Sequence, residues 1–133
     1  MGTRKAARQR LATLFTGQGF NVVYSYAPVD LKGATKVLCI FADGSDRGRA
    51  SRHLINDFHD LFLDTYVKRE SGINTEDTLD DLHDIVLAVV QANVGDPAWN
   101  ELTLEDKSDC LFVEVAGTPY RTERHIVHIK ITT

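Results

Sequence analysis

The chain has 133 residues, of which 43% are hydrophobic and 26% are charged, and its formal net charge is −4. This length favours a single domain over residues 1–133, and the composition excludes disordered and fibrous proteins. The chain has no run of about 18 apolar residues that would span a membrane, and its basic start has no apolar stretch behind it. We therefore expect a protein with no signal peptide and no membrane segment, made in a reducing cytoplasm.

The distribution of charge and the two cysteines narrow the class of protein further. Residues 54–110 hold fourteen carboxylates against three basic residues, whereas the first ten residues include four basic ones. Because nucleic-acid binding depends on neutralising phosphates, the acidic middle argues against a nucleic-acid groove there. The basic start is interpreted as a solvated helix face. Cys39 and Cys110 each lie in an apolar run, which predicts two reduced core thiols rather than a disulfide or a metal pair.

The first third of the chain predicts one helix and two strands. Over residues 3–16 apolar residues recur at i, i+4, i+7 and i+8, the pattern of a helix with one buried face. Residues 20–27 alternate as in a strand, and residues 36–42 are apolar on both faces, which is typical of a central strand. Residues 43–52 combine two glycines with five charged side chains and are predicted to form a long, mobile loop.

The segment over residues 54–70 is ambiguous. Its apolar residues fit a helix at one spacing and a strand at another, so periodicity does not decide between them for residues 54–63. The aromatic and β-branched string FLDTYV favours a strand from about residue 58. Residues 74–92 form the clearest helix. Asn74 or Thr75 is its expected N-cap, and four acidic residues occupy its first two turns, where the helix dipole favours negative charge.

The last part of the chain predicts a polar connection and a β-hairpin. Residues 98–109 form the connection, anchored by Trp99 and Leu102. The strings CLFVEVA and RHIVHIKITT are predicted to be strands joined by a turn over residues 117–120, with Leu111, Val113, Val115, Val127, Ile129 and Ile131 facing the core. The resulting order is α-β-β-β-α-β-β, an α+β fold with a mostly antiparallel sheet and two helices packed on one face.

The histidines do not predict a metal centre. His125 and His128 are three residues apart, which on a strand places them on opposite faces, and His83 falls on the polar side of the second helix. A zinc site needs three or four convergent ligands, and no local spacing supplies them. We therefore expect no metal and no cofactor, and we interpret these side chains as surface or hairpin histidines.

The other reactive residue types do not predict an enzyme. The serines of residues 43–52 lack the Gly-x-Ser-x-Gly context of a hydrolase nucleophile. Aspartates could gather around a divalent cation as in nucleases, but an acid-rich helix start and a solvated strand face explain them better. The aspartates on which that nuclease alternative depends are Asp57, Asp60, Asp64, Asp80, Asp81 and Asp84.

Three strings resemble the tail terminator (tail completion) proteins of long-tailed bacteriophages. They are VVYSYAPVDLKGATKVLCIFADGSDR, NTEDTLDDLHDIVLAVV and VEVAGTPYRTERHIVHIKI, and DPAWNEL matches the family's tryptophan in the connection after the helix. The likeness covers nearly the whole chain and lies in order and spacing. It implies a structural protein without a reaction or a cofactor, which forms a hexameric ring on the head-proximal end of the tail tube and ends tube polymerisation. It also implies that the ambiguous segment is a strand that follows a long loop.

The resemblance implies a set of partners and a location. The partners are copies of the chain itself, the major tail tube protein and the head completion or connector protein, with DNA only in transit. The location is the tail–head junction of the virion, assembled in the host cytoplasm. Another neck or head–tail completion factor is the alternative within this class. The candidate interface residues, from the predicted loop and from the outer face of the last strand, are Asp43, Ser45, Asp46, Arg47, Arg49, Arg52, His128 and Lys130.

Overall fold

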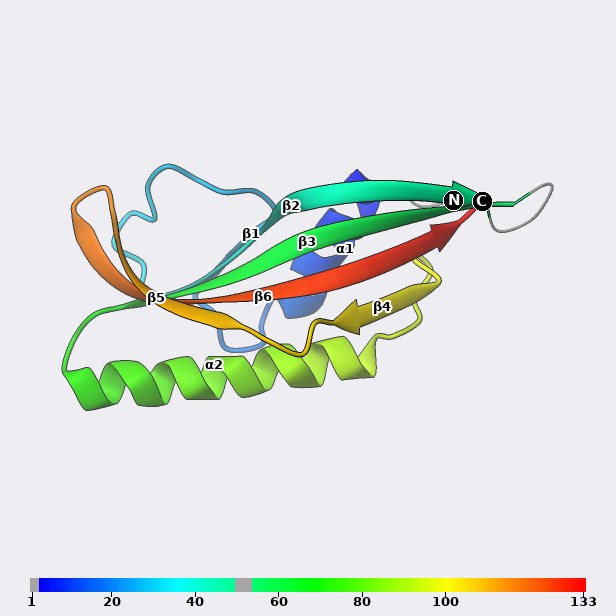
Figure 1. Cartoon of the computed structure of the whole chain (residues 1–133). Helices are drawn as coiled ribbons and strands as arrows, with labels where there is room; N and C mark the ends of the chain where they lie inside the picture. Colours follow the sequence, from blue (N-terminus) through cyan, green and yellow to red (C-terminus); the bar gives the residue numbers. More distant parts are fainter. Residues whose placement is uncertain (1–2, 50–53) are drawn as a thin grey trace.

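Three long antiparallel strands form the spine of one sheet, and both helices pack on the same face of it (Figure 1). The computed structural model describes residues 3–49 and 54–133. The predicted α+β class and order of elements are confirmed, with one additional short strand, β4, inside the predicted connection. The helices are α1 (Arg4–Phe15) and α2 (Gly72–Ala92), and the strands are β1 (Val22–Tyr24), β2 (Lys36–Arg49), β3 (Ile55–Lys68), β4 (Glu101–Leu104), β5 (Asp109–Val115) and β6 (Thr118–Thr132).

The strands lie in the order β1-β2-β3-β6, and β4 and β5 share the remaining edge of β6. β5 pairs with residues 118–124 of β6, and β4 pairs with residues 127–130. The β1–β2 pair is parallel and the other pairs are antiparallel. Because β3 pairs along its whole length with β2 and β6, the ambiguous segment is a strand, and the helical alternative for residues 54–63 is wrong.

The predicted loop over residues 43–52 is wrong for its described part. β2 continues to Arg49 and pairs with the first half of β3, whereas residues 50–52 lie outside the described residues. The ladder is irregular between Ala42 and Gly44, where Asp43 is the extra residue of a β-bulge. Figure 1 shows this end of the hairpin projecting past α2. Pairing with β3 therefore stabilises the end of β2 without an apolar core beneath it. A polar sequence is for this reason compatible with a strand there.

The helices differ in how well their starts were predicted. α1 begins after its N-cap Thr3, within the predicted range. α2 begins at Gly72, and Thr75 lies in its first turn, where the hydroxyl donates to the carbonyl of Ser71 at 2.9 Å. The predicted cap at Asn74 or Thr75 is therefore wrong, and the acidic residues begin in the second turn. The residues buried on the two helices are Ala7, Leu11, Phe15, Thr75, Leu79, Leu82, Val86 and Val90.

Apolar residues are buried on both faces of the sheet. The larger cluster lies between the sheet and the helices, and it contains the predicted anchors Trp99 and Leu102. The smaller cluster lies on the opposite face, where Leu31 and Tyr120 are buried and the Tyr120 hydroxyl donates to the carbonyl of Ala34 at 3.1 Å. The prediction that β6 faces the core with Val127, Ile129 and Ile131 is confirmed.

Two strand boundaries differ from the predicted ones. Of the predicted strand over residues 20–27, only Val22–Tyr24 pairs with β2. The turn of the closing hairpin consists of Ala116 and Gly117, whose φ angles are 50° and 84°. Two consecutive positive φ values are the backbone of a two-residue type I′ turn, so residues 118–120 belong to β6 rather than to the turn.

β5 is less buried than predicted. Val113 and Val115 pack against the smaller cluster, but Leu111 is 59% exposed, and its predicted core position is wrong. Cys110 is also exposed, whereas Cys39 is buried as predicted. The reason is position: β5 is an outermost strand with a neighbour on one side only, so an apolar sequence there does not imply burial.

Candidate protein interface

Within residues 3–49 and 54–133, the two longest stretches of strand edge without a partner strand lie on β2 and β5. β1 covers β2 only at Val37–Cys39, so the outer backbone edge of residues 40–49 is unpaired with any strand. β5 pairs with β6 along one side, so the outer edge of Asp109–Val115 is also free. At roughly 3.3 Å per residue, these edges are about 33 Å and about 23 Å long. Such edges present backbone N–H and C=O groups that can pair with another chain.

Exposed apolar side chains accompany both edges. Leu54, Ile55 and Phe58 are exposed where β3 begins, beside the end of β2, and we call them the β3 patch. Leu111 and Phe112 are exposed on opposite faces of β5, where the Phe112 ring lies 4.2 Å from the guanidinium of Arg121, and we call these two residues the β5 patch. In Figure 1 the β5–β6 turn and the β2–β3 hairpin lie at opposite ends of the sheet. The described part of the chain thus has two unlike free edges with exposed apolar side chains, one at each end of the sheet.

The predicted interface residues on β2 take part in the hairpin. The Ser45 hydroxyl accepts a hydrogen bond from Arg4 at 3.0 Å and lies 2.7 Å from Nδ1 of His59, whose pKa is lowered by burial. Arg47 donates to Asp57 at 2.7 Å, and this hydrogen bond raises the pKa of Arg47. The other four are Asp43 and Asp46, which are exposed, Arg49, which ends β2, and Arg52, which lies outside the described residues.

His128 and Lys130 alternate along β6 with buried residues of the larger cluster, so they lie on the sheet face away from the helices, as predicted. Nδ1 of His128 is 2.6 Å from the carboxylate of Asp60, and Nε2 is 3.6 Å from that of Glu105. Both side chains remain partly exposed, and their role in an interface stays a prediction.

The aspartates of the nuclease alternative do not converge. On β3, positions 57 and 60 project to opposite faces of the sheet. On α2, the three aspartates are exposed to solvent. Each aspartate of β3 has its own basic partner, and the pairs are Asp57–Arg47, Asp60–His128 and Asp64–Arg124. The fold therefore does not form the oxygen-rich centre that this alternative needs.

Sequence reasoning missed one cluster of polar side chains. His83 on α2 meets Glu123 and His125 on β6, and their ligand atoms all lie within 4.8 Å of one another. His125 is a histidine of the closing hairpin, as one of the two interpretations had it, but at 2% exposure it is not a surface residue, and this burial lowers its pKa. A signal was present in the sequence, since Glu123 and His125 share one face of a strand. Their partner His83 lies 40 residues away and could not be assigned from local spacing.

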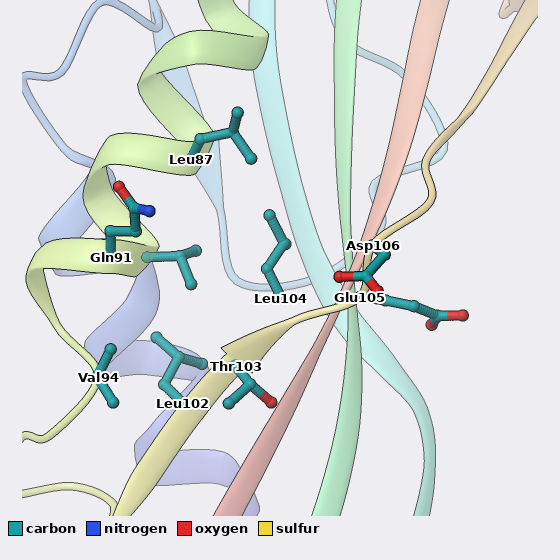
Figure 2. Close-up of a pocket in the computed structure, with 9 residues that line it drawn as sticks. Leu87, Gln91, Val94, Leu102, Thr103, Leu104, Glu105 and Asp106 are labelled. Carbon is teal, nitrogen blue, oxygen red and sulfur yellow. The ribbon is translucent and has the colours of Figure 1, made fainter.

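A pocket of about 440 Å³ lies between the second half of α2 and β4 (Figure 2). Figure 2 shows the side chain of Glu105 pointing away from the helix. Aliphatic side chains from both elements form most of the walls, and neither histidine nor cysteine lines them. The lining residues are Leu87, Val90, Gln91, Val94, Leu102, Thr103, Leu104, Glu105 and Asp106.

No protein-family model matches the chain, and no curated protein matches its sequence. In the described part of the chain, neither helix has the length and apolar character needed to cross a membrane. A functional interpretation therefore depends on the fold, on its free edges and on the geometry of particular side chains.

Proposed function

We propose that this chain is a structural subunit of a bacteriophage tail, which joins copies of itself in a ring at the head-proximal end of the tail tube and ends tube polymerisation. The observation that carries the proposal is the pair of unlike free edges, on β2 and on β5, at opposite sides of one sheet. The order of the elements agrees with the resemblance of the sequence to tail terminator proteins. The role requires no reaction and no cofactor.

A ring needs two different surfaces on each subunit. If a surface paired with its own copy, the contact would be satisfied in a two-fold dimer, whereas a head-to-tail contact repeats until the circle closes. The β2 edge with the β3 patch differs from the β5 edge with the β5 patch in length and in residues. Addition of β5 from one copy to β2 of the next would use both edges of every subunit. The resemblance gives six as the expected number of subunits.

The edges also carry features that prevent indiscriminate pairing. The bulge at Asp43 breaks the regular spacing of the β2 edge, and charged residues follow it along the strand. β5 carries a carboxylate near each end, at Asp109 and Glu114. A strand that pairs with β2 must accommodate the bulge and the charges, which favours one matched neighbour over arbitrary strands.

Polymerisation of the tail tube protein in the presence and absence of this chain tests the proposed function. With the chain present, we expect tubes that stop growing and carry a ring at one end in negative-stain electron micrographs. Tails assembled without it should have uncontrolled length. Unchanged tube growth, together with sedimentation of the chain as a monomer both alone and with tubes, would contradict the proposal.

A Phe112→Ser variant tests the β5 patch, with Val29→Ser as the matched control. Val29 is 93% exposed but lies in the loop between β1 and β2, outside the sheet. We expect F112S to keep its circular dichroism spectrum and to lose ring formation on tubes, because its exposed ring is no longer offered to a neighbouring copy, whereas V29S should assemble like the unmodified chain. If both variants assembled equally well, the β5 edge would not be the interface.

A further inference from the structure

The ligand atoms of His83, Glu123 and His125, which we call the His–Glu–His cluster, form a compact triangle. Nδ1 of His83 is 3.0 Å from Oε2 of Glu123 and 2.9 Å from Nε2 of His125, and the latter two atoms are 3.7 Å apart. Bonds of about 2.0–2.1 Å to a tetrahedral zinc ion place neighbouring ligand atoms about 3.3 Å apart. The three sides of the triangle bracket this value, so a single ion fits at bonding distance from all three atoms.

The secondary structure holds the cluster in place. Glu123 and His125 are two residues apart on β6 and project from the same face, towards α2, where His83 meets them. The side chains of Glu123 and His125 are 7% and 2% exposed, whereas that of His83 is 35% exposed. The cluster is thus enclosed by protein on one side and reachable by solvent beside His83. The hydroxyl of Ser108 donates to Oε2 of Glu123 at 2.6 Å and orients the carboxylate, as outer-shell partners of metal ligands do.

A single proton cannot make both short contacts of Nδ1 of His83 into linear hydrogen bonds. If Nδ1 of His83 carries a proton, that proton must serve both the carboxylate and Nε2 of His125. If Nε2 of His125 carries it instead, the lone pair of His83 faces the carboxylate oxygen, which is repulsive. A cation at the centre turns three mutually repelling lone pairs into three ligands.

We propose that the His–Glu–His cluster binds a divalent transition-metal ion of the zinc class, with water as the fourth ligand beside His83, and that the ion ties α2 to β6. Two imidazoles and one carboxylate are a donor set that suits Zn²⁺ and leaves one position open. The site does not depend on the ring function, since its residues lie on the helix-facing side of β6 rather than on a free strand edge.

Zinc binding by the full chain tests the site directly. After treatment with chelator and equilibrium dialysis against Zn²⁺, mass spectrometry of the metal content should give one tightly bound ion per chain. The melting temperature should rise when Zn²⁺ is restored. A chain that retains no stoichiometric Zn²⁺ and melts at the same temperature with and without it would overturn the proposal.

Variants distinguish this cluster from other histidines. Loss of an outer-shell partner weakens metal binding about 10–100-fold, so loss of a ligand in His83→Ala or Glu123→Gln should weaken Zn²⁺ binding by at least about 100-fold. His83 is partly exposed and Glu123→Gln preserves shape, so both variants should fold. His128→Ala, which removes a histidine that also contacts a carboxylate, should bind Zn²⁺ like the unmodified chain. If H128A and H83A weakened Zn²⁺ binding equally, the ion would bind outside the His–Glu–His cluster.

Two further variants define the coordination. Ser108→Ala should weaken Zn²⁺ binding by about 10–100-fold, because the carboxylate loses the donor that orients it. Cys110 pairs with Glu123 across the β5–β6 ladder, and Cys110→Ser should leave Zn²⁺ affinity unchanged if water is the fourth ligand. A loss of binding in C110S as large as that in H83A would overturn the three-ligand site. The absorption spectrum of the Co²⁺-loaded chain should likewise show no thiolate charge-transfer band.

Discussion

Arg124 is expected to stabilise the buried carboxylate of Asp64 in the folded chain. The side chain of Asp64 is 6% exposed, and its two oxygens accept hydrogen bonds from Nε and Nη2 of Arg124, both at 2.8 Å. The guanidinium also lies 3.8 Å from the ring centroid of Phe62. Replacement of Arg124 by methionine keeps much of the aliphatic stem but leaves the carboxylate without its charged partner.

The expected loss follows from this geometry. Removal of one member of a fully buried ion pair costs about 3–5 kcal/mol. Because the side chain of Arg124 is 42% exposed, water partly replaces the guanidinium, and we expect about 2–3 kcal/mol, including about 0.5–1 kcal/mol from the lost contact with Phe62. With a urea dependence of about 2 kcal/mol/M for a chain of this size, the unfolding midpoint should fall by about 1–1.5 M.

Urea unfolding can be followed through Trp99, which is the one tryptophan of the chain and is 3% exposed. The cycle of Arg124→Met, Asp64→Asn and the double variant isolates the pair. We expect the double variant to lose clearly less stability than the sum of the single variants, because it carries neither charge and so leaves none unpaired. A midpoint shift below about 0.3 M for R124M, or strict additivity, would refute the ion-pair reasoning.

Three further predictions concern the turn, the loop after α2 and the thiols. Gly117→Ala should cost about 1 kcal/mol in thermal unfolding, because a φ of 84° disfavours a residue with a Cβ, and an unchanged stability would contradict this. Arg10 hydrogen bonds to Asp96 and thereby lowers the pKa of that carboxyl below its unfolded value. This stabilisation is present above about pH 4 and is lost as the pH falls through the folded pKa. Arg10→Ala should therefore destabilise the chain less at pH 3 than at pH 7 in urea unfolding, and equal losses at the two pH values would argue against this ion pair. Burial raises the pKa of Cys39 to about 12, whereas Cys110 is exposed, so iodoacetamide should modify only Cys110 in the folded chain and both thiols after unfolding, as counted by mass spectrometry.

The elements that the sequence predicts well are those with a buried apolar stripe. Both helices and the second half of β6 have one, and their faces follow from periodicity. β4 has four residues, of which only Leu102 is fully buried, so it gives no pattern of its own. The far half of β2 is polar on both faces, because pairing with β3 holds it rather than burial. Its glycines and charges therefore predict a loop where the structure has a strand.

Long-range contacts set the remaining features. Residues 54–63 fit two periodicities, and the choice between them depends on β2 and β6, which lie on either side of β3 in the sheet. Burial of Cys110 and Leu111 was expected from an apolar run, but the outermost position of β5 decides their exposure. The His–Glu–His cluster needs α2 to cross the same face of β6 that carries its other two members, and no local spacing contains that information.

Ring formation and metal binding can be tested separately because the first uses the outer edges of β2 and β5, whereas the second uses α2 and the helix-facing side of β6. β5 is held by the backbone ladder to β6, so its outer edge should stay in place when the ion is removed. The cluster lies on the helix-facing side, where α2 packs against β6, and it includes no residue of the β5 patch. F112S should therefore bind Zn²⁺ normally, and H83A should still form rings on tubes. If H83A failed to form rings while the unmodified chain formed them equally well with and without Zn²⁺, His83 would act on the interface through packing rather than through an ion.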